Sequence, residues 1–178
     1  MGYKLIWAIF LTSFFTVRGL HSNAQSNNQM SQTEGQPESS SFTDVDSLTT
    51  SLGCKPELWH YVYDPGRLEI KKKCISVTGT IVGSNADEDG DQHMLLKLDN
   101  QVSLLTKKNV SKKDGNLVIE AICINNIRKK KAMGACNGYV NHVQLPKVGD
   151  HVKVTGSYVI DTHNGWAEIH PITEIILQ

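Results

Sequence analysis

Apolar and polar residues alternate along much of the chain after Cys74, which is the pattern of β-strands that bury one face. This alternation predicts five strands, at about residues 74–82, 93–99, 116–124, 151–159 and 167–177. We expect an irregularity at Pro171 in the fifth strand, because proline cannot donate a hydrogen bond to the sheet. Helical spacing of apolar residues is not apparent in this part of the sequence. The pattern therefore predicts an all-β domain.

The first and fourth predicted strands carry a glycine in the same place, at Gly79 and Gly156. A glycine within a strand often marks a sharp bend, and small closed barrels need strands that bend in this way. The long segment 125–143 separates strands three and four, as in the OB-fold, where a helix or long loop commonly joins them. We therefore expect a small five-stranded OB-like barrel with a long loop or short helix between strands three and four. Residues 59–63 are expected to pack across it as an N-terminal strand.

The beginning of the chain has a different composition. Lys4 precedes an uncharged, mostly apolar run at 5–17, and small residues around Ala24 suit a signal peptidase. We predict a signal peptide at 1–24, a disordered polar linker at 25–51, and the OB-like β-barrel domain at 52–178. The protein would be secreted, or periplasmic in the cell envelope, with no stable transmembrane helix after cleavage. Arg18, directly after the apolar run, keeps an uncleaved anchor as the alternative.

Length and charge narrow the possible functions. The chain has 178 residues, 39% of them hydrophobic, with 18 basic and 18 acidic side chains. It is too short for a multidomain enzyme and too balanced in charge for a general binder of polyanions. Without the two basic residues of 1–24 and the four acidic residues of 25–51, residues 52–178 keep 16 basic and 14 acidic side chains.

All four cysteines lie in the predicted barrel domain, at Cys54, Cys74, Cys123 and Cys136. An exported chain with an even number of cysteines is expected to form disulfides, and four cysteines allow three pairings. We favour Cys54 with Cys74 and Cys123 with Cys136, because each pair brackets a segment without strong periodicity. A zinc site made of four thiolates is the alternative, although the spacing contains no C-x2-C element.

Acidic residues lie beside histidines in the two segments 87–93 and 161–171. Three pairs are each separated by two positions and so project toward one face of an extended chain: Asp91 and His93, Asp161 and His163, Glu168 and His170. Imidazole and carboxylate together suit zinc or another divalent metal ion, with candidate ligands His93, His163, His170 and Glu168. The Asp, Asn and Gly residues of these two segments are also common in turns, which need no bound ligand. Trp166 could stack on a ring of a bound molecule or plug the end of the barrel.

The segment from Cys54 to Leu177 resembles an uncharacterised family of small exported OB-fold-like β-barrel domains. The resemblance rests on three motifs: Cys74-x4-Gly79-Thr80, Asp89-Gly90-Asp91-x-His93, and Gly165-Trp166-x-Glu168-Ile169-His170-Pro171. It implies an architecture and not a reaction. The Asp89-Gly90-Asp91 loop is also similar to the acidic calcium-binding loop of thermonuclease-like enzymes. Those enzymes need arginines, and residues 52–178 contain only Arg67 and Arg128, in contexts that do not match.

These observations favour an exported binding or accessory module. Its candidate ligand-binding residues are Asp91, His93, His163, Trp166, Glu168 and His170. The ligand could be an oligosaccharide (a glycan), an oligonucleotide (nucleic acid) or another envelope protein. The alternative is a metal-dependent hydrolase with an Asp/Glu/His site at the strand ends, which needs a divalent metal cofactor such as zinc. A purely structural envelope protein is the third possibility.

Overall fold

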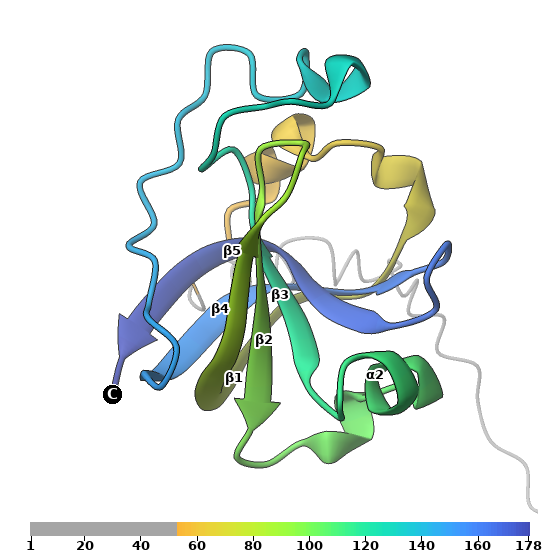
Figure 1. Cartoon of the computed structure of the whole chain (residues 1–178), viewed down its shortest axis with the longest axis vertical. Coiled ribbons are helices and arrows are strands. Elements are labelled where there is room, and N and C mark those ends of the chain that lie inside the picture. The colour runs from red at the N-terminus through yellow and green to blue at the C-terminus, as the bar shows by residue number, and fades with distance from the viewer. Residues whose placement is uncertain (1–52) are drawn as a thin grey trace, which may run out of the picture. The chain divides into compact units, whose positions relative to one another are not determined.

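The computed structural model describes residues 53–178. The predicted signal peptide (1–24) and linker (25–51) lie outside the described residues. Five strands form one sheet that closes on itself in the order β1-β2-β3-β5-β4 (Figure 1). The strands are β1 (Leu68–Ala86), β2 (Gln92–Leu98), β3 (Leu117–Ala121), β4 (His151–Asp161) and β5 (Ala167–Leu177). All neighbouring pairs are antiparallel except β3 and β5, which are parallel. The predicted all-β class with five strands is confirmed.

The helical elements are short. They are η1 (Pro56–Tyr61), η2 (Pro65–Arg67), η3 (Val102–Leu104), α2 (Lys107–Lys112) and η4 (Lys130–Ala132). The connection from β3 to β4 is the long loop expected from the sequence, with only η4 in it. The N-terminal strand expected at 59–63 is wrong, because most of this stretch belongs to η1. Pro56 begins that helix, where a missing N–H costs nothing.

Strand β1 begins at Leu68, six residues before the alternation becomes visible at Cys74. Residues 69–73 are exposed, so they bury no apolar face and leave no alternating signal. They nevertheless pair with the end of β4, with register shifts on both sides of Lys72. The alternation of apolar and polar residues therefore could not predict this part of the strand.

The two glycines expected at bends lie where backbones approach closely. A Cβ atom on Gly79 would collide with the carbonyl oxygen of Lys97 in β2, and one on Gly156 with that of Pro171 in β5. The irregularity expected at Pro171 is present. Gly156 pairs with Ile172 and Tyr158 with Ile169, so β5 has one more residue than β4 between these pairs. This bulge bends the two strands around the closed sheet.

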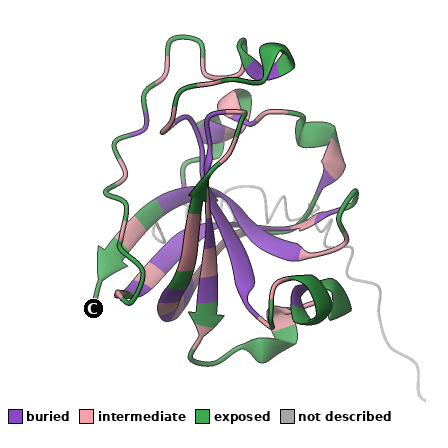
Figure 2. Ribbon diagram, in the orientation of Figure 1, coloured by how far each residue is buried: buried purple, intermediate pink, exposed green. Residues whose placement is uncertain are grey.

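The core has two parts, one on each face of the sheet. The interior cluster includes the fully buried Ile81, Met94, Leu96, Ile119 and Ile169. A second cluster on the outer face contains Leu58, Val62, Leu68, Ile122, Cys123 and Val159. Strand β3 is consequently buried along its whole length, as Figure 2 shows. Polar side chains that point outward from β3 and β5 are thus enclosed as well, and the candidate site is built from them.

Two disulfides join Cys54 to Cys74 and Cys123 to Cys136. The favoured pairing is confirmed, and it excludes the zinc site of four thiolates because every cysteine is oxidised. Disulfides indicate a non-reducing compartment. Within residues 53–178, no helix is long and apolar enough to cross a membrane.

Candidate functional site

A cavity of about 530 Å³ opens where the β1–β2 loop faces the β4–β5 turn. Its lining includes His93 and Glu120 from β2 and β3, and His163 and Trp166 from the turn that precedes β5. The cavity thus brings together the two histidine-bearing segments that the sequence analysis singled out.

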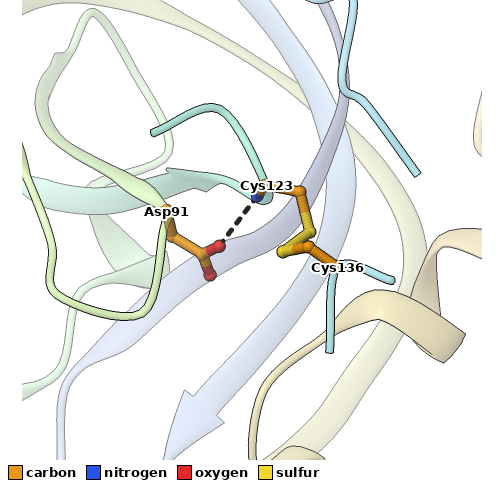
Figure 3. A group of neighbouring side chains, drawn as sticks. All are labelled: Asp91, Cys123 and Cys136. Atoms are coloured by element: carbon orange, nitrogen blue, oxygen red, sulfur yellow. Dashed lines mark hydrogen bonds between the residues drawn. A yellow bond between two sulfur atoms is a disulfide. The ribbon is translucent and has the colours of Figure 1, made fainter. Parts of the chain in front are cut away.

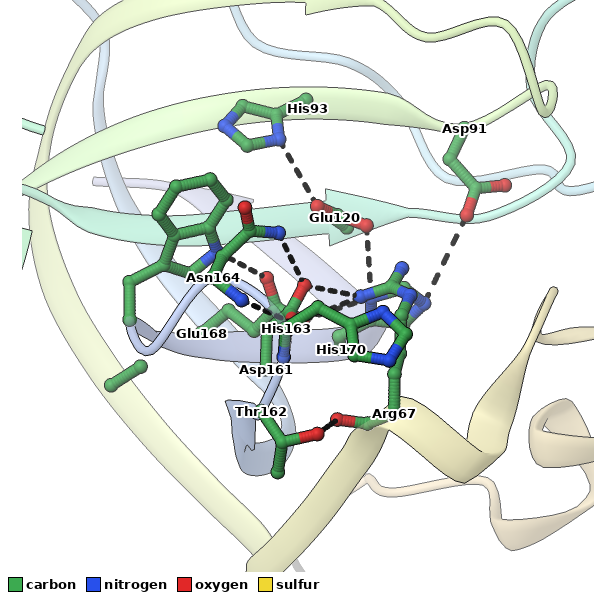
Figure 4. Close-up of polar contacts among 12 residues, drawn as sticks. Arg67, Asp91, His93, Glu120, Asp161, Thr162, His163, Asn164, Glu168 and His170 are labelled. Carbon is green, nitrogen blue, oxygen red and sulfur yellow. Dashed lines mark hydrogen bonds and ion pairs between the residues drawn. The ribbon is translucent and has the colours of Figure 1, made fainter. Parts of the chain in front are cut away.

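Glu120 is the central residue of the site. Leu117, Ile119 and Ala121 on β3 face the barrel interior, so Glu120 points to the covered outer face, where its side chain is 7% exposed. Its neighbour across the β2–β3 ladder is His93, and the Oε1 atom of Glu120 lies 3.0 Å from His93 Nδ1. Its Oε2 atom lies 2.9 Å from Nδ1 of His170 on β5. Figure 4 shows Glu120 between the two imidazole rings.

His170 is completely buried among carboxylates. Its Nδ1 atom is 3.4 Å from Glu168 Oε1, and its Nε2 atom is 3.9 Å from Asp91 Oδ2. Burial lowers the pKa of His170, but the charges of Glu120 and Glu168 and contacts with them outweigh it, so the pKa is well above its ordinary value. Burial likewise raises the pKa of Glu120, but the charge of His170 and the contacts with both histidines bring the net pKa below its ordinary value. In the metal-free protein, we therefore assign an imidazolium at His170 and a carboxylate at Glu120.

Asp91 is the buried carboxyl group beside Nε2 of His170. Its Oδ1 atom accepts a hydrogen bond of 2.9 Å from the backbone N–H of Cys123, beside the Cys123–Cys136 disulfide (Figure 3). Burial raises the pKa of Asp91 to about 7, and His170 only partly opposes this effect. The two sulfur atoms lie close to Asp91 but are bonded to each other, so they offer no thiolate to a metal ion.

Arg67 is the second cation of the network. Its Nη1 atom is 2.7 Å from Asp161 Oδ2 and 3.7 Å from Glu168 Oε1. Asp161 also holds the β4–β5 turn, because its Oδ1 atom accepts the backbone N–H groups of His163 and Asn164. Two cations, Arg67 and His170, thus face the four largely buried carboxyl groups of Asp91, Glu120, Asp161 and Glu168.

Trp166 and Lys113 lie beside His93 at the cavity wall. The indole N–H of Trp166 donates a 3.1 Å hydrogen bond to Glu168, and the Lys113 ammonium lies 3.9 Å from the centre of the Trp166 ring system. Lys113 Nζ is also 3.2 Å from His93 Nε2. Because an ammonium can only donate, Nε2 is assigned as the acceptor, and the proton of a neutral His93 lies on Nδ1, facing Glu120.

Helix α2 fixes the turn that carries Trp166. Asn109 on this helix is fully buried, and its side chain donates to the carbonyl of Ala167 and accepts from the N–H of Ala167. The hydroxyl of Thr106, at the N-cap of α2, donates to the carbonyl of Gly165. The helix was not predicted, because its six residues contain only one apolar side chain.

Of the four predicted metal ligands, His93 and His170 belong to two different groups of possible donors. Within residues 53–178, donors close enough for one metal ion and not held in a disulfide occur in Asp87-His93-Glu120 and Asp91-Glu120-His170. Glu168 adjoins the second group through His170, whereas His163 belongs to neither and is exposed on the turn. Glu120 was not predicted from the sequence, where its signal was a single charge inside the apolar run 117–122. Asp87 was not predicted as a ligand either.

No protein-family model matches the chain, and no curated protein matches it in sequence. The resemblance to small exported OB-fold-like domains therefore stays a prediction.

Proposed function

We propose that the protein is an exported, OB-like barrel that acts as a metal-dependent hydrolase, with Asp87, His93 and Glu120 as metal ligands. The strand order β1-β2-β3-β5-β4 and the long β3–β4 connection support the OB-like architecture. The two disulfides and the predicted signal peptide support export.

The convergence of two carboxylates on one imidazole nitrogen carries this proposal. Glu120 Oε1 and Asp87 Oδ2 lie 3.0 Å and 3.8 Å from the same atom, Nδ1 of His93, and all three residues line the cavity. Ligands bound to zinc at about 2.0–2.2 Å lie about 3–3.5 Å from each other in a tetrahedral site. Three protein ligands with an open fourth position are typical of catalytic zinc, which lowers the pKa of a bound water to about 7.

Metal binding has a definite consequence for Lys113. An ion on Nδ1 of His93 requires the ring proton to move to Nε2, so the contact between Lys113 and Nε2 must open. The Lys113 ammonium would remain over the Trp166 ring, at the edge of the cavity. It would then be free to contact an anionic group of a substrate held beside the metal-bound water.

Elemental analysis of the exported protein, after exhaustive dialysis without added chelator, tests this proposal. We expect at least one zinc or similar ion per chain, with one equivalent lost on the substitution Asp87→Asn. His163→Ala is the matched control, since His163 lines the same cavity but belongs to neither ligand group. Hydrolysis of a panel of chromogenic phosphate and carboxylate esters should require the metal and fail in the Asp87→Asn variant. A folded wild-type protein without metal after incubation with zinc would contradict the proposal.

A binding module without catalysis is the second candidate, and the orientation of Trp166 favours it. The Trp166 indole is held by Glu168 and by Lys113 at the wall of a cavity large enough for a sugar ring or a base. An oligosaccharide, an oligonucleotide or an envelope protein would bind there through Trp166. Such binding should persist in the presence of a chelator and be lost on Trp166→Ala, whereas hydrolysis should stop once the metal is removed.

A further inference from the structure

The group formed by Asp91, Glu120 and His170 lies deeper than the proposed catalytic ligands. One donor atom from each residue lies within 4.8 Å of the other two, and all three residues are buried. Of the three, only Glu120 also lines the cavity. The group is therefore connected to the cavity through the carboxylate of Glu120.

Several polar atoms at this position are not satisfied by the surrounding protein. Both ring nitrogens of His170, and Oε1 of Glu168 beside it, form no hydrogen bond with any described residue. His170 Nδ1 is close to Glu120 but outside hydrogen-bonding geometry. Buried polar atoms are almost always paired, so three unpaired atoms in contact indicate a missing partner such as a bound ion.

The charges nearby favour a cation as that partner. Among the described residues 53–178, Arg67 and His170 are the two cations assigned to this network of four carboxyl groups. Arg67 lies 2.7 Å from Asp161 and 3.7 Å from Oε1 of Glu168, so carboxyl groups remain in excess even with this contact counted. An isolated excess of buried carboxylate is costly unless it is protonated or coordinated to a metal.

From these observations we infer that a second divalent metal ion binds between Asp91, Glu120 and His170, with Glu120 bridging it to the first. The inference rests on the proposed function, because the bridge requires an ion at the cavity group. Glu120 directs Oε1 toward His93 and Oε2 toward His170, which is the orientation a bridging carboxylate needs. Paired metal ions in hydrolases lie about 3.5–4 Å apart. One imidazole with carboxylate oxygens suits zinc or manganese.

Titration of the chelator-treated, full-length exported protein with zinc or manganese, followed by elemental analysis, tests the inference. We expect two equivalents in the wild type, one in Asp91→Asn, one in Asp87→Asn, and none in Glu120→Gln. His163→Ala should keep both equivalents. Near-ultraviolet circular dichroism checks that each variant is folded, and asparagine at position 91 can still accept the Cys123 N–H.

The two proposals fail in different ways. One equivalent that is lost in Asp87→Asn but kept in Asp91→Asn overturns the second ion and leaves the cavity ion intact. One equivalent with the reverse behaviour overturns the cavity ion and with it the bridge. No bound metal in the folded wild type overturns both.

Anomalous scattering from wild-type crystals soaked in manganese gives a second measurement that needs no variant. Two peaks, on the His93 and His170 sides of Glu120, would support the inference. A single peak on the His93 side would overturn it.

Discussion

Replacing Glu120 with glutamine tests whether its charge holds the buried network together. The Glu120 side chain is 7% exposed, and its two oxygens lie 3.0 Å and 2.9 Å from the Nδ1 atoms of His93 and His170. Glutamine keeps the shape but removes the charge, so the fully buried His170 loses its nearest counter-charge. Removing one partner of a buried ion pair costs about 3–5 kcal/mol. For a folded domain of this size, the melting temperature should fall by about 10–20 °C.

The loss should depend on pH in a direction set by the two pKa values. The raised pKa of His170 gives stability that is complete below its unfolded value of about 6.5 and is lost as the pH rises through the folded value. The lowered pKa of Glu120 gives stability that is present above its unfolded value of about 4.3 and is lost as the pH falls. Both contributions are present near pH 6. The difference in unfolding free energy between wild type and Glu120→Gln should therefore be largest there and should decrease once the pH exceeds the folded pKa of His170.

Urea unfolding followed by circular dichroism, in excess chelator over a pH series that rises from pH 6, measures this difference. Glu174→Gln is the matched control, because Glu174 is exposed on β5 and should change the unfolding free energy by less than about 0.5 kcal/mol. A loss below about 1 kcal/mol for Glu120→Gln at pH 6, or a loss that stays constant at every higher pH at which the wild type remains folded, would refute the reasoning.

Three further predictions concern the surroundings of Glu120. The pKa of Asp91 is raised from 3.8 to about 7, so the chelated wild type should lose up to about 4 kcal/mol of stability between pH 4 and pH 8. Asp91→Asn should flatten this part of the profile, and an unchanged slope would contradict the raised pKa. Asn109→Ala should cost about 2–4 kcal/mol and change the tryptophan fluorescence, while Val110→Ala on the exposed side of α2 should do neither. Replacing both Cys123 and Cys136 with alanine should cost about 3 kcal/mol for a separation of 13 residues, measured by urea unfolding; a loss near zero would contradict it.

The strands were predictable where they bury an apolar face, because burial then produces an alternating pattern in the sequence. Strands β2, β4 and β5 each bury an apolar face, and their alternation placed them close to their observed bounds. Gly79 and Gly156, which were expected at bends, lie where the strands pass close to one another. The start of β1 was not predictable in this way, because residues 69–73 hydrogen-bond to β4 without burying apolar side chains. Helix α2 depends on the buried Asn109 and a capping box, which a search for apolar periodicity does not detect.

The site was predictable only in part, because residues on paired strands can be neighbours although they lie far apart in the sequence. The spacing of Asp91 and His93, and of Glu168 and His170, marked both histidine-bearing segments. The residue that joins them is Glu120, 27 positions after His93, and it becomes a neighbour only through the β2–β3 register. Its sole local signal was a charge within an apolar strand, and a charge buried in this way needs a partner. His163 had the same spacing to Asp161 as the other pairs but lies on a turn, where the local alternation of strand faces no longer applies.

The number of carboxyl groups explains why this network should respond to metal ions. Four largely buried acids share two cations, so at least one acid is only weakly ionised, and the pKa of about 7 identifies Asp91 as that group. A divalent ion between Asp91 and His170 would supply the missing positive charge and displace protons from both residues. Metal binding should then release protons near neutral pH, and the number released per ion follows from calorimetric titration in buffers of different ionisation enthalpy. Release of more than one proton per chain would indicate that the inner group is occupied, because Asp91 and His170 carry the protons available for displacement.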